Sequence, residues 1–412
     1  MNESRRRALL LAYFFPPIAG AGVQRTLKFV RYLEPLGWDA TVVSTRSRVY
    51  GARDETLLAE VPPSTRVVRT AALPLARYLA IVLYKLRLNR LRSFVLWPDN
   101  GLGWAPFAFI AAMRAARRDH PDVIYSTSAP YGSHIVAMLV SRLTGIPWIA
   151  DFRDEWAANP HLADLPRPLP ALAERAERAV TAHAGRVVVV ADYFELAGLP
   201  AGDAHRVEIV NGVDPADFAA EMPGPPTNRF VLSFIGSLYD SINPAAALRV
   251  LASLAERGAI DAERIEVRIV GSVWIPGFEP PPGVRVETTG YVPHAQAVAE
   301  MCAATALLFY VPSSSLAPSG KLFEYLASGR PLLCLARPDN LASRLVAEWD
   351  AGVIAEPDDE DGIERAFLTL WQRWENAGLA DQEQVRAKVF GQYSRQANAA
   401  RLAEVLDEAT GG

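Results

Sequence analysis

The segment SGKLFEYLASG contains residue types that could bind phosphate and hydroxyl groups side by side. Lys321 and Glu324 are three positions apart, so a helix would present both side chains on one face. A lysine can neutralise charge that develops on a phosphate, and a carboxylate can accept hydrogen bonds from two neighbouring hydroxyls. The alternative is a solvated surface pair, worth only about 0.3–0.5 kcal/mol. The apolar neighbours favour a packed helix, and Ser319 and Gly320 directly precede the lysine.

A second group of charged residues lies in the segment WIADFRDEW. Asp151, Arg153 and Asp154 come directly after a predicted strand, where sites in α/β proteins are found. Either aspartate could orient a hydroxyl or help to deprotonate it, and Arg153 could hold a phosphate or an acidic partner. We therefore predict a catalytic role for this segment. A buried arginine–aspartate pair that only stabilises the loop is the structural alternative.

The segment YFFPPIAGAGVQR allows two incompatible interpretations. With the preceding RRRALLL it could form a secretory signal peptide, or it could be a buried strand, a glycine-rich turn and a helix. The following forty residues complete a strand–helix–strand unit, and Pro16-Pro17 interrupts a short apolar run, so we predict the folded turn. Gly20, Ala21 and Gly22 would then place backbone amides at a helix start, facing an anion or a hydroxyl. The alternative is that the glycines serve the turn alone.

Short apolar segments alternate with helical periodicity along the chain, which indicates parallel sheets covered on both faces. The alternation restarts after a polar, proline-rich stretch. The predicted fold class is therefore α/β, with two Rossmann-like domains facing across a cleft. The predicted parts are an N-terminal domain at 1–213, a linker at 214–229, a C-terminal domain at 230–390 and a last helix at 391–412 that packs back on the first domain.

Composition narrows the class of partner. The chain has 412 residues, 50% of them hydrophobic, and a formal net charge of −4, which gives no reason to expect nucleic acid. No apolar run reaches the eighteen or so residues that a membrane-spanning helix needs. Cys302 and Cys334 lie in apolar surroundings, as core residues of a reduced, cytoplasmic protein do, rather than in a metal or redox motif.

One stretch departs from this charge balance. Between Glu60 and Asp99 there is no acidic residue, whereas seven arginines and lysines fall there. Residues 77–97 interleave these basic residues with leucines and aromatic residues, as a helix at a membrane interface does. We predict contact with a membrane surface, on the inner face of the cell membrane. An ordinary solvated helix is the alternative.

Five fragments, in this order along the chain, resemble the GT-B glycosyltransferases and, within them, the retaining enzymes of family 4. They are FPPIAGAGVQR, ADFRDEW, VEIVNGVD, FIGSL and PSGKLFEYLASGRPLL. DFRDEW is more typical of a subgroup that assembles bacterial surface polysaccharides. The resemblance implies transfer of a sugar from a nucleoside-diphosphate sugar to a hydroxyl of a glycan or lipid-linked acceptor, with retention and without a metal or other cofactor. It also implies that the N-terminal domain faces the acceptor and that the C-terminal domain binds the donor.

The resemblance also implies roles for individual residues. Lys321 would neutralise the leaving diphosphate and Glu324 would bind the ribose, while the glycine loop would lie near the transferred sugar. The remaining predicted donor-site residues are Ser319, Gly320, Gly236 and Ser237, with Tyr291 as a stacking surface for the base.

The sequence departs from the family pattern at three places. Ser237 and Asn243 stand where a basic pair is usual, Leu316 replaces the first glutamate of the E-x7-E motif, and the histidine after the fourth strand is missing. We predict that Lys321 and Arg25 supply the positive charge instead. Two alternatives stay open: a nucleotide-sugar 2-epimerase of the same fold, against which the basic aromatic helix argues, and a non-catalytic binding or scaffold relative.

Overall fold

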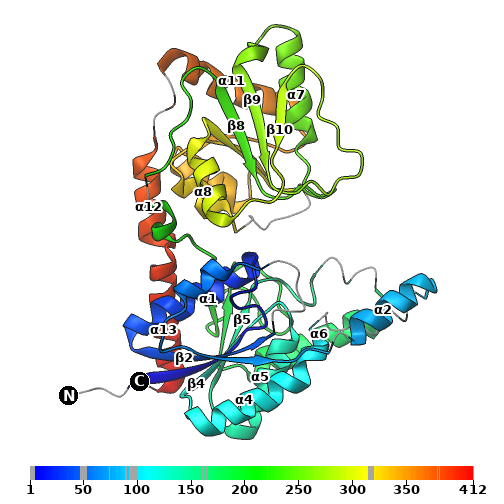
Figure 1. The fold of residues 1–412 in the computed structure, drawn as a ribbon, viewed down its shortest axis with the longest axis vertical. Helices are drawn as coiled ribbons and strands as arrows, with labels where there is room; N and C mark the ends of the chain where they lie inside the picture. The colour runs from blue at the N-terminus through cyan, green and yellow to red at the C-terminus, as the bar shows by residue number, and fades with distance from the viewer. Residues whose placement is uncertain are drawn as a thin grey trace. The chain divides into compact units, whose positions relative to one another are not determined.

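The computed structural model describes residues 5–46, 53–73, 75–88, 91, 101–159, 162, 165–166, 168–219, 221–313, 320–377, 379 and 381–411. The chain divides into two compact units (Figure 1). Unit 1 comprises Met1–Asn211 and Arg395–Gly412, and unit 2 comprises Gly212–Ser394. Each unit has its own parallel sheet and its own core.

Within its described residues, unit 1 contains a seven-stranded sheet in the order β3-β2-β1-β4-β5-β6-β7. The strands are β1 (Arg6–Leu11), β2 (Trp38–Thr45), β3 (Arg66–Thr70), β4 (Val123–Thr127), β5 (Trp148–Phe152), β6 (Arg186–Val189) and β7 (Arg206–Glu208). The helices are α1 (Ala21–Leu33), α2 (Leu75–Lys85), α4 (Ala105–Asp119), α5 (Gly132–Thr144), α6 (Pro168–His183) and α13 (Arg395–Thr410). Every neighbouring pair of strands is parallel, so all carboxyl ends meet at one edge.

The central strand β1 shows why its sequence is apolar throughout. Successive side chains of a strand point to opposite faces. Leu9 and Leu11 belong to the core under α4, α5 and α6, whereas Ala8 and Leu10 belong to the core under α1 and α13. Both faces of the sheet are thus covered, and the first apolar segment of the chain is a buried strand.

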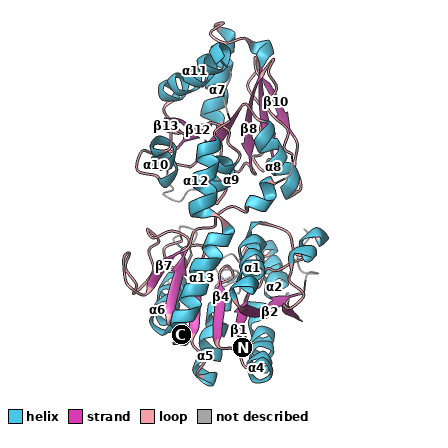
Figure 2. Ribbon diagram, turned by 90° about the vertical axis from the view of Figure 1, so that its left-hand side faces the viewer, coloured by secondary structure: helices cyan, strands magenta, loops and turns pink. Residues whose placement is uncertain are grey.

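Unit 2 contains, within its described residues, a six-stranded parallel sheet in the order β10-β9-β8-β11-β12-β13 (Figure 2). The strands are β8 (Phe230–Ile235), β9 (Ile265–Val270), β10 (Arg285–Thr288), β11 (Ala306–Tyr310), β12 (Leu332–Leu335) and β13 (Gly352–Ala355). The helices are α7 (Ala245–Glu256), α8 (His294–Ala303), α9 (Leu322–Ala327), α10 (Leu341–Glu348), α11 (Glu360–Ala377) and α12 (Glu383–Tyr393). Its core includes aromatic contacts of Phe230 with Phe367, Trp371 and Trp374.

The two sheets confirm the predicted α/β class with two Rossmann-like domains. The C-terminal segment differs in detail from the single helix expected at 391–412. α12 ends at Tyr393 and belongs to unit 2, whereas α13 begins at Arg395 and packs in unit 1, where Trp38 Nε1 donates to Asp407 at 3.0 Å. Among the described helices, none combines the length and the apolar character needed to cross a membrane.

Candidate functional site

In unit 2, the start of α9 meets the end of β8. The Lys321 ammonium donates to the carbonyl oxygen of Ile235 at 3.1 Å, and a Cβ atom built on Gly236 would lie 3.3 Å from its nitrogen. One turn further along α9, the Tyr325 hydroxyl accepts from the Ile235 amide at 2.6 Å and donates to the Ile235 carbonyl at 3.1 Å. The folded chain therefore brings the FIGS and GKLFEYL segments together, with Lys321 against the backbone that opens the domain.

The environment of Lys321 suits it to an anionic ligand. Burial lowers the pKa of Lys321 from its usual value, and the negative charge of Glu324 opposes that shift. Glu324 is half-buried and lies in the first turn of α9, as its spacing from Lys321 predicts. A partly desolvated ammonium interacts more strongly with a phosphate than one in bulk water. The pair can thus present a cation and a carboxylate at the same edge of the sheet.

Gly271 lies beside this contact, although the donor-site residues predicted by number did not include it. It follows β9 as Gly236 follows β8, and the two backbones nearly touch: a Cβ on Gly271 would lie 2.1 Å from the carbonyl oxygen of Gly236. The Gly236 amide also donates to the Val270 carbonyl at 2.9 Å. Two strand–glycine junctions, FIGS and IVGS, were the available signal in the sequence. Only a residue without a side chain at 271 leaves room for the turn beside Lys321.

Gly271→Ala should therefore displace the Gly236 turn and weaken anion binding by Lys321. The clash involves backbone, which cannot rotate away, so we expect a loss of roughly 2 kcal/mol or more in stability of unit 2. Urea unfolding with and without a nucleoside diphosphate measures both effects. Gly224→Ala is the matched control, because a Cβ there meets nothing within 4 Å. Equal behaviour of the two variants would contradict the assigned role.

The other predicted donor-site residues are less tightly connected. Ser237 is half-buried directly after Gly236, and Gly320 is exposed before Lys321, whereas Ser319 lies outside the described residues. The side chain of Asn243 accepts from the amide of Ala245, the first residue of α7, at 3.1 Å. Tyr291 lies between β10 and α8, with 71% of its surface exposed.

In unit 1, Asp151 and Arg25 form a buried ion pair. Two guanidinium nitrogens of Arg25 donate to the two carboxylate oxygens of Asp151 at 3.0 and 2.7 Å, and Thr127 Oγ1 donates to the same carboxylate at 2.7 Å. The third nitrogen of Arg25 donates to the Val210 carbonyl at 3.0 Å. Burial alone would raise the pKa of Asp151, but the charge and hydrogen bonds of Arg25 outweigh it and lower that pKa.

These contacts bear on two predictions. Asp151 is 0% exposed, so its carboxylate does not reach the surface of unit 1. Arg25 is 3% exposed, and its guanidinium donates to Asp151 and to the Val210 carbonyl inside unit 1. Its charge is therefore already paired and does not favour the predicted contact with a diphosphate. Both residues instead hold α1 against the carboxyl ends of β4 and β5. The structural alternative of a buried arginine–aspartate pair describes Asp151 better, although its arginine is Arg25.

Arg153 joins two backbone segments through three carbonyl groups. Its guanidinium donates to the carbonyl of Gly22 at 2.7 Å, to that of Ala129 at 3.0 Å and to that of Ser128. Burial lowers the pKa of Arg153, against the opposing charges of Asp151 and Asp154. The side chain thus fixes the glycine loop to the turn before α5, and its predicted phosphate contact stays a prediction.

The glycine loop and Asp154 occupy the surface of this cluster. Gly20 has φ = 120° and is the N-cap of α1, which begins at Ala21, so a left-handed residue is required where the helix starts. Gly22 leaves room for Arg153, since a Cβ there would lie 3.3 Å from the guanidinium. Of the three predicted catalytic residues, Asp154 alone is exposed. Partial desolvation of its carboxyl raises the pKa of Asp154, and the charge of Arg153 opposes this shift. Asp154 is thus the member of the group best placed to accept a proton or a hydrogen bond.

Two glycosyltransferase family models match successive parts of the chain. Residues 20–212 match the model of the Glycosyl transferase 4-like domain, and residues 229–373 match the model of Glycosyl transferases group 1. No curated protein matches the chain significantly.

Solved structures show the same fold at low sequence identity. HepE from Anabaena, in complex with UDP and glucose, superposes with a TM-score of 0.63 at 15% identity, covering 98% of this chain and 100% of HepE. The glycotransferase of kitacinnamycin gives 0.56 at 16% identity, covering 98% and 99%. A putative UDP-N-acetylglucosamine 2-epimerase from Listeria monocytogenes gives 0.53 at 12% identity, covering 98% and 96%.

Proposed function

This chain belongs to the family 4-like glycosyltransferases of the GT-B fold, and on that premise we propose that it transfers a hexosyl group from a uridine diphosphate sugar to a hydroxyl group. The proposed acceptor is a glycan or a lipid-linked molecule, and the transfer proceeds with retention. The proposed role is the assembly of a bacterial polysaccharide. The choice of uridine rests on the UDP found with HepE. The observation that carries the proposal is the contact of Lys321 with the end of β8.

The residues of unit 2 would act on the donor. The reaction breaks the bond between the anomeric carbon and the diphosphate, and negative charge grows on the diphosphate as it leaves. Lys321 would stabilise that charge, Glu324 would accept hydrogen bonds from the ribose hydroxyls, and Tyr291 would stack on the base. Gly236, Ser237, Ser319 and Gly320 would supply backbone and hydroxyl donors to the phosphates.

The residues of unit 1 would act on the acceptor. Its hydroxyl oxygen forms the new bond on the face that the diphosphate leaves, and its proton passes to a diphosphate oxygen. Asp154 would orient this hydroxyl, and the loop Gly20–Gly22 would pack against the transferred sugar. Arg153, Arg25 and Asp151 would hold these groups in place without touching the substrate.

The product of the reaction tests the proposal. The chain is incubated with UDP-sugars and a panel of glycan and lipid-linked acceptors, and the anomeric configuration of the product is determined by proton NMR. We expect UDP release only with an acceptor, and a product of the donor's configuration. A free epimer formed without acceptor would identify a 2-epimerase, and binding without turnover would identify a non-catalytic relative.

We further propose that α2 touches the inner surface of the cell membrane. Of the predicted segment 77–97, residues 89–90 and 92–97 lie outside the described residues. Within the described part, Tyr78, Tyr84 and Leu86 are 64%, 62% and 61% exposed, and Lys85 is exposed among them. α2 lies at the margin of unit 1, away from its sheet (Figure 1). Exposed aromatic and leucine side chains next to cations fit an anionic lipid surface.

Vesicle sedimentation tests this contact. We expect binding to vesicles that contain phosphatidylglycerol and little binding to phosphatidylcholine alone. Lys85→Glu/Arg87→Glu should weaken binding by about 2 kcal/mol or more, roughly 30-fold, since each basic residue near such a surface contributes about 1 kcal/mol. The control is Arg114→Glu/Arg117→Glu, which reverses two exposed charges on α4. An equal loss in both double variants would mean that net charge, and not α2, determines binding.

A further inference from the structure

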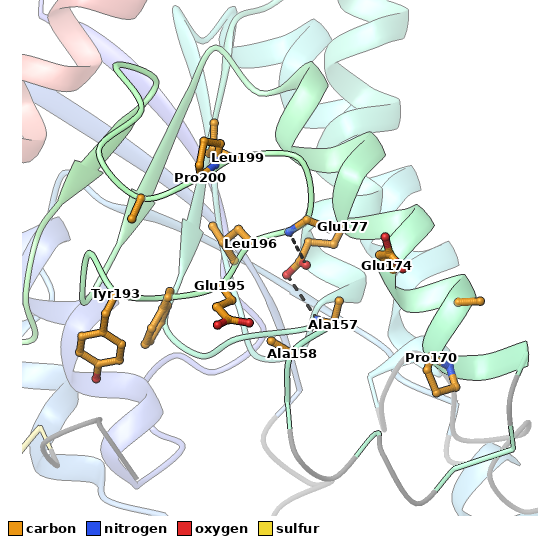
Figure 3. Close-up of a pocket in the computed structure, with 14 residues that line it drawn as sticks. Ala157, Ala158, Pro170, Glu174, Glu177, Tyr193, Glu195, Leu196, Leu199 and Pro200 are labelled. Atoms are coloured by element: carbon orange, nitrogen blue, oxygen red, sulfur yellow. Dashed lines mark hydrogen bonds between the residues drawn. The ribbon is translucent and has the colours of Figure 1, made fainter.

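Unit 1 contains a pocket of about 920 Å³ that none of the roles above uses. It lies between α6 and the loop that follows β6, with Ala157 and Ala158 of the loop after β5 along one side (Figure 3). Both loops start at the carboxyl ends of their strands, the edge of the sheet that also carries Arg153 and Asp154. Pockets that hold drug-sized ligands span about 300–1,000 Å³, so this one has room for a short oligosaccharide.

Among the described residues that line the pocket, the ionisable groups are all acidic. Alanine, proline and leucine side chains form most of its wall, and the chargeable lining residues are Glu174, Glu177, Glu195 and Tyr193. Among the described residues that line the pocket there is no lysine, arginine or histidine. Apolar patches with an aromatic ring and carboxylate acceptors can contact the C–H faces and the hydroxyls of a sugar.

The three glutamates differ in their exposure and in the partners that their carboxylates bind. Glu177 is 0% exposed and accepts from the amides of Ala197 at 2.9 Å and Ala157 at 3.4 Å, so it braces the two loops (Figure 3). Glu174 pairs with Arg178 at 2.8 Å on the surface of α6. Glu195 is exposed, and its backbone amide, not its carboxylate, bonds to Glu155 at 2.7 Å.

Carboxylates outnumber cations among the described residues around this pocket, since the neighbouring cations are Arg178, which pairs with Glu174, and Arg206, which donates to the carbonyls of Phe194 and Leu199 at 3.0 and 3.1 Å. Burial raises the pKa of Glu155, and the charges of Glu195 and Asp154 raise it further. The pKa of Glu177 is likewise raised by burial and by the charge of Glu155. A ligand with its own negative charge would add to this repulsion, whereas hydroxyl and amino groups would relieve it.

We propose that this pocket binds a sugar unit of the acceptor that carries hydroxyl or amino donors and no negative charge, with Glu195 as its selecting carboxylate and Tyr193 as its aromatic surface. The inference rests on the proposed glycosyl transfer and names the acceptor class for it. Acceptors whose sugar at this position bears a phosphate or a uronic acid are excluded by the same charges.

Binding of three defined oligosaccharides tests the proposal. The probes are the trisaccharides of glucosamine, N-acetylglucosamine and galacturonic acid, and saturation-transfer NMR and calorimetry measure their binding to the full chain. We expect the first two to bind and the third to fail. Glu195→Lys should weaken the glucosamine trisaccharide roughly tenfold and admit the galacturonic acid trisaccharide, because it replaces attraction by repulsion. Glu195→Gln should retain the N-acetylglucosamine trisaccharide.

Glu263→Lys, an exposed charge reversal in unit 2, is the matched control and should leave all three affinities unchanged. UDP binding in the same samples separates this proposal from the proposed function. If UDP binds but none of the trisaccharides does, or if Glu195→Lys leaves their order of affinity unchanged, the pocket assignment is wrong while the donor assignment stands. If UDP fails to bind as well, the proposed function itself is in error.

Discussion

Arg25→Ala should lower the free energy of unfolding of unit 1 by about 3–5 kcal/mol, the cost of leaving a buried charge without its partner. Asp151 would keep the bond from Thr127 but lose two charge-assisted bonds from Arg25. Urea unfolding followed by hydrogen–deuterium exchange measures the loss, because exchange resolves the two units. Arg178→Ala, which breaks an exposed pair, is the control and should cost about 1 kcal/mol or less.

The free energy of unfolding lost in Arg25→Ala should decrease as the pH falls. In the natural protein the pKa of Asp151 is depressed, so the pair stabilises unit 1 above the unfolded carboxyl pKa of about 4, and this stabilisation is lost as the pH falls through the folded value. In Arg25→Ala, the isolated buried carboxyl would have a raised pKa and would be protonated in mild acid. The difference in free energy of unfolding between the natural protein and Arg25→Ala should therefore decrease from neutral pH towards pH 4.

Arg25→Met/Asp151→Leu should recover most of the stability lost in Arg25→Ala, because it removes both charges and keeps apolar volume. A loss below about 1 kcal/mol for Arg25→Ala, or a pH-independent loss, would contradict the account of this ion pair.

Lys321→Ala should lower kcat by roughly 100- to 1,000-fold, which is the usual effect of removing one group that stabilises transition-state charge. The leaving diphosphate would lose the cation held against the end of β8. Steady-state kinetics with a saturating UDP-sugar measure the effect. Glu324→Gln should mainly raise KM for the donor, because its proposed contacts with the ribose persist through the reaction.

The control is Lys388→Ala, which removes a lysine of α12 whose ammonium lies over the ring of Trp349. It should change kcat little. Equal kcat values for Lys321→Ala and the natural protein would remove Lys321 from the chemistry.

Much of the fold could be predicted because the local patterns of apolar and charged residues follow the periods of strands and helices. The apolar run of β1 fits a strand buried on both faces, and the spacing of Lys321 and Glu324 fits one face of α9. The restart of the pattern at β8 likewise indicated a second domain.

The partners of charged residues could not be predicted in the same way. Asp151 lies 126 positions from Arg25, and the sequence offers Arg153 as a nearer candidate. The folded sheet places β4 between β1 and β5, and in this arrangement α1 reaches Asp151. Arg153 instead donates to backbone carbonyls. The close approach of Gly271 to Gly236 and the acidic pocket could not be predicted for the same reason: each depends on segments brought together by the fold.

The central claim is that Lys321 belongs to a nucleoside-diphosphate site, and thermal unfolding with a panel of nucleoside diphosphates tests it most directly. A ligand at about one hundred times its Kd adds roughly 2.7 kcal/mol to stability, which raises the Tm measurably. We predict that UDP raises the Tm of the natural protein and leaves that of Lys321→Ala unchanged. If no diphosphate raises the Tm of the natural protein, or if UDP stabilises both proteins equally, Lys321 is not the residue that binds the donor.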